Sequence, residues 1–447
     1  METPLHPSLD QMTAWLALAR ELGADEADIM AVTTRQQSAT CRLGALESAE
    51  HAETLALGLR VFKDSKQALI SFSTNEITRQ SLADALGRAA AMPRDATNRL
   101  PSAEAVLSGE APSLDICDNT PPSTQQLVTR AQTLEQAALD VKGITNSEGA
   151  IAHWTHDSIT LMASNGLRQH YETSQHGFML SVLAGEGTAM QRDYDYQSAV
   201  YASDLDDLTV IGRQTAERAL KRLHPRKLAS AKMPVVYHPR VAQSLLKHLA
   251  SALYGDALAR GTSFLRESLG KKIMPATLTI IDDPLQKRGL NSRPCDAEGL
   301  ASQTRTIVAE GVLRSFLLDH RSSLLLNRTS TAHAYRKADS LPTAKESNLT
   351  LQAGSSSPSD LIGAIKRGFY VTELLGLSLN INNGDYSRGA SGFLIDNGTL
   401  QEPLAEMTIA GNLKDMFQAL TPANNLQLRY GIDAPTCVVD SMTVGGK

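Results

Sequence analysis

The dipeptide Asn165-Gly166 stands between two segments of strand-like sequence, ITLMAS and LRQHYETS. Asn-Gly is the strongest short-range signal for a β-hairpin, because both residues tolerate the positive φ angles that a tight turn requires. Gly185 and Gly187 mark a second turn farther along the chain. We therefore expect antiparallel sheet over residues 143–200. A hairpin makes its two strands neighbours in one sheet. The other elements of the chain must then pack on or beside this sheet.

Helix signals occur on both sides of this stretch. Ser8 can cap a helix in which the apolar side chains fall on one stripe. Ser123 and Gln126 have the spacing of a capping box, in which each side chain bonds the backbone of the other residue. On such signals we expect helices over residues 8–22, 78–92, 123–140, 207–223 and 359–373.

Strands are expected before the hairpin as well. Leucine and valine alternate with other residues near position 57, which favours a strand within 38–72. The prolines of residues 100–122 indicate a linker. The sequence predicts an α+β fold, with an N-terminal α/β domain of helices and antiparallel strands and a C-terminal β-rich domain with a few helices. The expected parts are 1–105, 106–225 (a helix plus antiparallel sheet) and 226–447.

Composition excludes several classes of protein. The net charge is −5, whereas a nucleic-acid-binding protein needs a basic face, so no nucleic-acid partner is expected. The N-terminus lacks the pattern of a secretory signal, and no apolar run reaches the ~18 residues of a membrane span. The cysteines form no CxxC pair, which fits a cytoplasmic protein better than a disulfide framework. They are Cys41, Cys117, Cys295 and Cys437.

Few residues suggest chemistry. His153 and His156 are the only close histidine pair, but on a strand they would point to opposite faces and could not share a metal ion. Cys295 could be a nucleophile in principle, but nothing nearby in the sequence supplies a general base to activate it. HExxH, GxSxG and Walker-type motifs are absent from the sequence. The residues alone therefore indicate an α+β protein without a visible catalytic centre.

Longer stretches resemble a known family. ITNSEGA, GEGTAMQRDY, GDYSRGASGFLIDNG, EMTIAGNLKDMF and DSMTVGGK are similar to segments of the PmbA/TldE proteins. GDYSRGASGFLIDNG is the most specific of them, and together they span most of the chain. The resemblance implies a bacterial protease system in which a PmbA/TldE-type chain pairs with a TldD-type chain as a heterodimer.

In that system the TldD-type chain carries zinc on an HExxxH helix and a later cysteine, and unfolded peptides are cleaved in an internal cavity. The roles implied by the family are peptide maturation, as for microcins, and antitoxin degradation. By the same resemblance, we expect no cofactor in this chain, zinc in its TldD-type partner, and unfolded peptides as substrates.

The resemblance also locates the helix that corresponds to the zinc helix, residues 244–264. YGDALARGTS is similar to the segment that follows HExxxH in TldD-type chains. Counting back from it, Leu246 and Ser251 occupy the two histidine positions and Lys247 occupies the glutamate position. The cysteine position falls near Tyr430. These degenerate positions imply no metal and no catalytic residue in this chain.

Three functions follow as hypotheses. The first is a non-catalytic TldE-type subunit that completes the cavity and guides the substrate. The alternatives are a peptidase that acts through an unrecognised site, and a non-enzymatic binding protein that modulates another enzyme. A charged loop is our candidate for contact with the substrate or cavity, although it could equally be a structural turn after Asn383-Gly384. Its residues are Asp385, Tyr386, Ser387 and Arg388.

Overall fold

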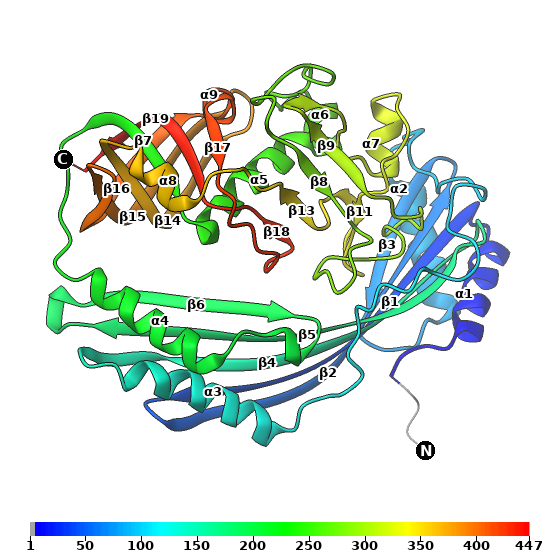
Figure 1. Cartoon of the computed structure of the whole chain (residues 1–447). Coiled ribbons are helices and arrows are strands. Elements are labelled where there is room, and N and C mark those ends of the chain that lie inside the picture. The colour runs from blue at the N-terminus through cyan, green and yellow to red at the C-terminus, as the bar shows by residue number, and fades with distance from the viewer. Residues whose placement is uncertain (1–4, 447) are drawn as a thin grey trace.

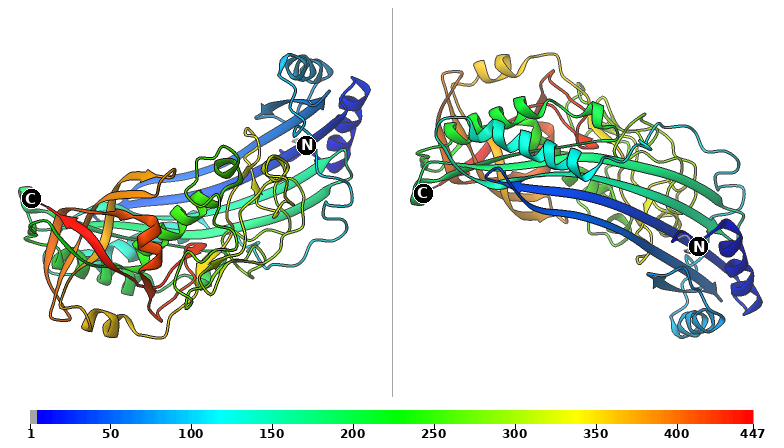
Figure 2. Two further views of the ribbon diagram at one scale, coloured as in Figure 1. Left: turned by 90° about the horizontal axis from the view of Figure 1, so that it is seen from above. Right: turned by 90° about the horizontal axis from the view of Figure 1, so that it is seen from below.

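The computed structural model describes residues 5–446 and has the predicted α+β fold. Its first half is dominated by one antiparallel sheet in the strand order β3-β2-β1-β4-β5-β6. The long strands of this sheet run beneath most of the molecule (Figure 1, Figure 2). One sheet thus joins residues 1–105 and 106–225. Its strands are β1 (Glu26–Arg42), β2 (Ala45–Lys63), β3 (Lys66–Phe72), β4 (Ile144–Ala163), β5 (Arg168–Ala184) and β6 (Gln191–Ala199).

The predicted hairpin joins β4 to β5. Ala163 donates its N–H to the carbonyl of Leu167, and Gly166 donates its N–H to the carbonyl of Ala163, both at 3.1 Å. The loop is therefore three residues long, one longer than the Asn-Gly dipeptide predicts. Gly166 closes it at φ +99°, a conformation that glycine adopts without steric cost.

Four helices cover the outer face of the long sheet. Three of them begin with a complete capping box, at Ser8, Thr78 and Ser123, of which the caps at Ser8 and Ser123 were predicted. Side chains of β1 that point outward pack under α1 at one end of the sheet and under α3 at the other. The helices are α1 (Leu9–Glu21), α2 (Arg79–Ala91), α3 (Thr124–Leu139) and α4 (Leu208–Lys221).

The C-terminal half lies against the inner face of the long sheet and contains two further sheets (Figure 1). In one of them, β16 pairs with β15 on one side and with β19 on the other, so the ring β16-β15-β14-β7-β19 closes into a small barrel. Its strands are β7 (Ala231–Tyr237), β14 (Arg367–Asn380), β15 (Asp385–Asp396), β16 (Thr399–Asn412) and β19 (Cys437–Gly445), with β17 (Leu420–Pro422) beside β19.

The other sheet has the order β10-β9-β8-β13-β18, and a two-stranded ribbon stands beside it. The sheet consists of β8 (Ile280–Asp282), β9 (Arg305–Ala309), β10 (Val312–Leu313), β13 (Leu349–Leu351) and β18 (Ile432–Asp433). The ribbon pairs β11 (Ala334–Tyr335) with β12 (Thr343–Ala344). The helices of this half are α5 (Pro239–Leu253), α6 (Gly255–Ala259), α7 (His320–Leu325), α8 (Pro358–Gly363) and α9 (Leu413–Gln418). Within residues 5–446, no helix is long and apolar enough to cross a membrane.

Two predicted helices were wrong in extent. Helix α8 ends at Gly363, and the rest of the predicted 359–373 helix is the start of β14. This segment pairs with β7 on one side and β15 on the other, so sheet contacts outweigh its local helical pattern. The predicted helix 244–264 starts earlier, at Pro239, and is broken at Tyr254, whose backbone is extended at ψ 134°.

A buried charge cluster joins the long sheet to the C-terminal half. Asp28 accepts hydrogen bonds from Arg60 Nε at 3.0 Å and from Arg336 Nη1 at 2.9 Å, and all three residues are buried. Burial alone would raise the pKa of Asp28, but Arg336 and Arg60 together hold it below its usual value. Glu298 adds a second carboxyl group 3.9 Å from Arg60.

Glu298 makes stability depend on pH. Burial raises the pKa of its carboxyl group to about 8, so the folded chain keeps a proton that the unfolded chain releases above its ordinary pKa near 4.3. Its contribution to stability is therefore lost as the pH rises from about 4 to about 8. The glutamine of Glu298→Gln can still accept the N–H of His320 but does not titrate. We therefore expect the free energy of unfolding of this variant to decrease less between pH 5 and pH 8 than that of the unmodified chain. Urea unfolding of both proteins at pH 5 and pH 8 measures the two decreases in free energy. Equal decreases in the two proteins would contradict the prediction.

Candidate functional site

Helix α5 follows β7 directly. His238 caps it, since its Nδ1 accepts the N–H of Arg240 at 3.1 Å, and Pro239 occupies the first helical position, where no N–H is needed. Most of its side chains lie in the core of the C-terminal half. Leu246 is one of these and is 2% exposed. Its side chain fills hydrocarbon space, so this position serves packing.

The other two degenerate positions on α5, Lys247 and Ser251, are less buried than Leu246. Ser251 donates its hydroxyl to the carbonyl of Lys247 at 2.8 Å, a bond within its own helix. Partial burial lowers the pKa of the Lys247 ammonium, while the nearby carboxylates of Glu346 and Asp433 oppose the shift. The alignment of these positions with zinc ligands stays a prediction.

Tyr430 precedes β18 and meets the same carboxylate. Its N–H donates to Asp433 Oδ1 at 2.9 Å, and the charge of Asp433 also acts on Lys247. The Tyr430 ring packs on Tyr196 with 5.1 Å between centroids. Burial raises the pKa of its phenol to about 12, so the group is neutral at physiological pH. The helix position and the distant cysteine position therefore lie in one neighbourhood.

The four residues predicted as a charged loop lie instead at the start of strand β15, and this part of the prediction was wrong. The preceding Asn-Gly turn is confined to residues 381–384, because Asp385 already pairs with Asn380 of β14 and with Asn412 of β16. Asp385 accepts the Asn383 side-chain N–H at 2.7 Å, while Arg388 donates from Nε to the Leu375 carbonyl at 3.3 Å. Ser387 pairs with Ala410 through the backbone. Contact of these residues with a substrate stays a prediction.

Tyr386 of β15 packs against helix α5. Its ring meets the His248 ring edge-on, with 5.7 Å between centroids, and both side chains are buried. Burial lowers the pKa of His248 to about 4, and the positive charge of Arg388 adds to the shift. His248 is therefore neutral at physiological pH. Its Nε2 has no hydrogen-bond partner among residues 5–446.

A second cluster of charges fixes the start of α5 against the long sheet. Asp193 on β6 is 1% exposed and accepts bonds from Arg240 at 2.9 Å, Arg222 at 3.2 Å and Arg218 at 3.3 Å. Arg222 also pairs with Glu373 on β14. The cluster thus connects α4, α5, β6 and β14 at one point.

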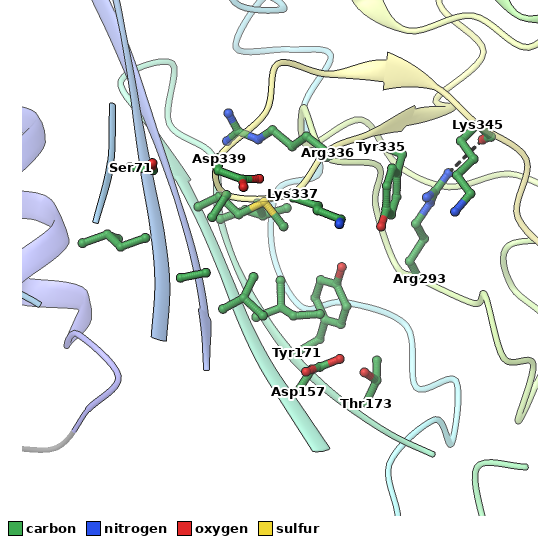
Figure 3. A pocket seen from close by; sticks show the side chains of 18 of the residues that line it. Ser71, Asp157, Tyr171, Thr173, Arg293, Tyr335, Arg336, Lys337, Asp339 and Lys345 are labelled. Atoms are coloured by element: carbon green, nitrogen blue, oxygen red, sulfur yellow. Dashed lines mark hydrogen bonds between the residues drawn. The ribbon is translucent and has the colours of Figure 1, made fainter. Parts of the chain in front are cut away.

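A cavity of about 740 Å³ lies between the inner face of the long sheet and loops of the C-terminal half (Figure 3). Its apolar wall is two cross-strand pairs, Met30 with Leu161 and Val32 with Ile159. The opposite wall is polar and charged. It includes Arg293, Tyr335, Lys337, Asp339, Lys345 and Glu346.

Glu346 connects this cavity to α5. It lines the cavity and accepts the hydroxyl proton of Tyr254, the residue at which α5 ends. The same carboxylate acts on Lys247, as described above. The degenerate helix therefore stands directly behind the charged wall of the cavity.

Comparison with known proteins agrees with this arrangement. Three models of PmbA/TldA metallopeptidase domains match the chain: domain 1 over residues 27–92, the central domain over 117–223 and the C-terminal domain over 230–446.

The chain belongs to the PmbA/TldA metallopeptidase family.

Relatives in this family match nearly end to end. Metalloprotease PmbA of Escherichia coli O157:H7 is 34% identical over 95% of this chain and 93% of its own length. A PmbA homologue of Haemophilus influenzae is 31% identical over 96% and 94%. The crystal structure of TldE from Thermococcus kodakarensis has a TM-score of 0.83 at 20% identity, covering 98% of this chain and 100% of its own, which shows the shared fold.

Two other candidates from the sequence have structural explanations in this PmbA/TldA fold. His153 and His156 lie on β4, where successive side chains alternate between faces, so they point apart as predicted. Cys295 is fully buried, and burial raises the pKa of its thiol to about 12, which keeps it protonated. A protonated thiol is a poor nucleophile.

The cavity residues were not found from the sequence. Met30 and Ile159 are 129 residues apart, and the opposing loop follows more than 170 residues after Ile159. Alternation along β1 and β4 predicts which side chains share a face, but nothing in it shows what faces them across the gap.

Proposed function

We propose that this chain is the non-catalytic, TldE-type subunit of a two-chain zinc protease that degrades or matures unfolded peptides. The observation that supports this proposal most is which side chains α5 carries. At the positions aligned with the zinc helix it carries a buried Leu246, a lysine ammonium and a serine bonded to its own helix. An ammonium repels a metal cation, and neither an alkyl group nor such a serine replaces a histidine ligand.

The cavity beside α5 supports a role in handling substrate. Its apolar wall suits the hydrophobic side chains that an unfolded peptide exposes, and its charged wall can hydrogen-bond a peptide backbone. We infer that the extended substrate passes through this space toward the zinc site of a TldD-type partner. Zinc is then a cofactor of the partner and plays no part at α5.

The proposal is tested by expressing the chain with a TldD-type partner from the same organism. We expect a stable heterodimer that cleaves an unfolded peptide, whereas this chain alone does not. Cleavage by this chain alone would overturn the proposal in favour of a peptidase with an unrecognised site. If no complex forms and neither chain affects the other, the subunit role fails.

Two variants in the complex separate the roles of the cavity and the helix. Val32→Arg places a charge in the apolar wall, and we expect kcat/KM to fall at least about tenfold with zinc content unchanged. Val210→Arg, at an exposed position on α4, is the matched control. Lys247→Ala should leave kcat/KM within about twofold. A large loss in Lys247→Ala with an intact fold would show that α5 takes part in the chemistry.

A further inference from the structure

The outer face of the long sheet has a gap between α1 and α3. In this gap three potential ligand side chains meet: Cys117 from the linker, His156 from β4 and Glu172 from β5. Their ligand atoms all lie within 4.8 Å of one another, and His156 Nε2 is 3.9 Å from Glu172 Oε1. This cluster lies on the opposite face of the sheet from the inner-face cavity, because residues 157, 159 and 161 of β4 face that cavity and His156 faces the other way.

The strand register places the two sheet ligands side by side. His156 pairs directly with Ser174, and Glu172 pairs with Ser158, so the histidine and the glutamate are diagonal neighbours on one face. Diagonal neighbours are within reach of each other when their side chains are long. Both sit on regular strands: His156 of β4 is paired with β1 on one side and β5 on the other, and Glu172 of β5 is paired with β4.

The linker is fastened above them by one residue. Ser174, the cross-strand partner of His156, donates its N–H to the Ile116 carbonyl at 3.0 Å. Its hydroxyl oxygen accepts the N–H of Asp118 at 2.6 Å. These two bonds flank Cys117 and hold it over the histidine and the glutamate. The backbone of the linker therefore positions the Cys117 thiol near the other two side chains.

We propose that Cys117, His156 and Glu172 bind one zinc ion on the outer face of this chain. Thiolate and imidazole ligands together favour zinc among the common divalent metals, and three protein ligands with a fourth open position form a known zinc arrangement. The glutamate side chain is 41% exposed, which leaves room for a water molecule as the fourth ligand.

Binding requires loss of the thiol proton. Burial, together with the negative charges of Glu172 and Asp118, raises the pKa of Cys117 to about 11 when no cation is bound. A zinc ion reverses the sign of the local field and displaces that proton.

Cobalt titration of the purified full-length chain, freed of metal with a chelator, tests the site. Cobalt replaces zinc in such sites and gives a thiolate-to-metal charge-transfer absorption only when a cysteine is a ligand. We expect one equivalent of cobalt to produce this band and one equivalent of zinc to abolish it. Cys117→Ser should remove the band and weaken zinc binding at least about 10- to 100-fold.

His156→Ala and Glu172→Gln should weaken zinc binding similarly, whereas His51→Ala, at an exposed histidine on β2, should leave it unchanged. Circular dichroism of each variant shows whether the sheet is intact. If the charge-transfer band is absent, or if Cys117→Ser binds zinc as tightly as the unmodified chain, the proposal is wrong. The result is independent of the subunit role, because this measurement needs neither a partner nor peptide cleavage.

Discussion

Replacing Asp193 with alanine should lower the free energy of unfolding by about 3–5 kcal/mol, the range found when one partner of a buried ion pair is removed. Asp193 is the shared acceptor for Arg240, Arg222 and Arg218, and the first two are themselves buried. Without the carboxylate, Arg240 stays in the interior without its ion-pair partner, and buried Arg222 keeps Glu373 alone. Truncation therefore costs more than the lost hydrogen bonds.

Urea unfolding of Asp193→Ala at pH 7 measures the effect. The control is Glu53→Ala, which breaks the exposed pair with Arg35 and should change stability by at most about 1 kcal/mol. Burial alone would raise the pKa of Asp193, but the arginines, Arg240 foremost, hold it below its usual value. Its stabilising contribution is thus present above the ordinary aspartate pKa and is lost as the pH falls through the lowered value. A loss no larger than that of Glu53→Ala would contradict the prediction.

Asp28→Ala should cause a loss of similar size, about 3–5 kcal/mol, at the junction of the long sheet and the C-terminal half. Asp28 is the acceptor for Arg60 on β2 and for Arg336, which follows β11 in the loop that lines the cavity. Removing it leaves two buried arginines facing each other. We expect that repulsion to displace the loop from the sheet.

Denaturant unfolding combined with limited proteolysis of the 335–345 loop would detect both effects. A double variant provides the internal control. In Asp28→Leu with Arg336→Met one arginine is removed together with its carboxylate, and Arg60 stays beside Glu298. Part of the lost stability should return, since a buried ion pair can be replaced by apolar residues of similar volume. If the double variant is less stable than Asp28→Ala, burial of unpaired charge is not the cause of the loss.

The sequence predicted the local parts of this fold well. Capping boxes at Ser8 and Ser123 and the glycine at 166 act through residues three or four positions away, so they can be recognised without tertiary structure. The predicted helix over 359–373 failed because its second half is paired on both sides in the barrel. Partners from distant segments decided that outcome.

Some residues of the candidate site could also be predicted from local sequence, and others could not. Leu246, Lys247 and Ser251 could be located because a motif beside them is similar to one in a known family. Glu346, which connects α5 to the cavity, lies almost a hundred residues after Lys247 and carries no motif. The grouping of Cys117 with His156 depends on the register of β4 and β5 and on one serine that holds the linker. Such groupings follow from topology, which residue types alone do not specify.

The pairing of β1 in the middle of the long sheet has a consequence for synthesis of the chain. Thr34 of β1 is paired with Asp157 of β4, 123 residues later, so one edge of β1 stays bare until β4 has left the ribosome. The hairpin of β1 and β2 can form earlier, but its open edge is a template for pairing with other nascent chains. Contacts of such long sequence separation also slow folding. The completion of this sheet, rather than of the helices around it, should therefore set the pace of folding in the cell.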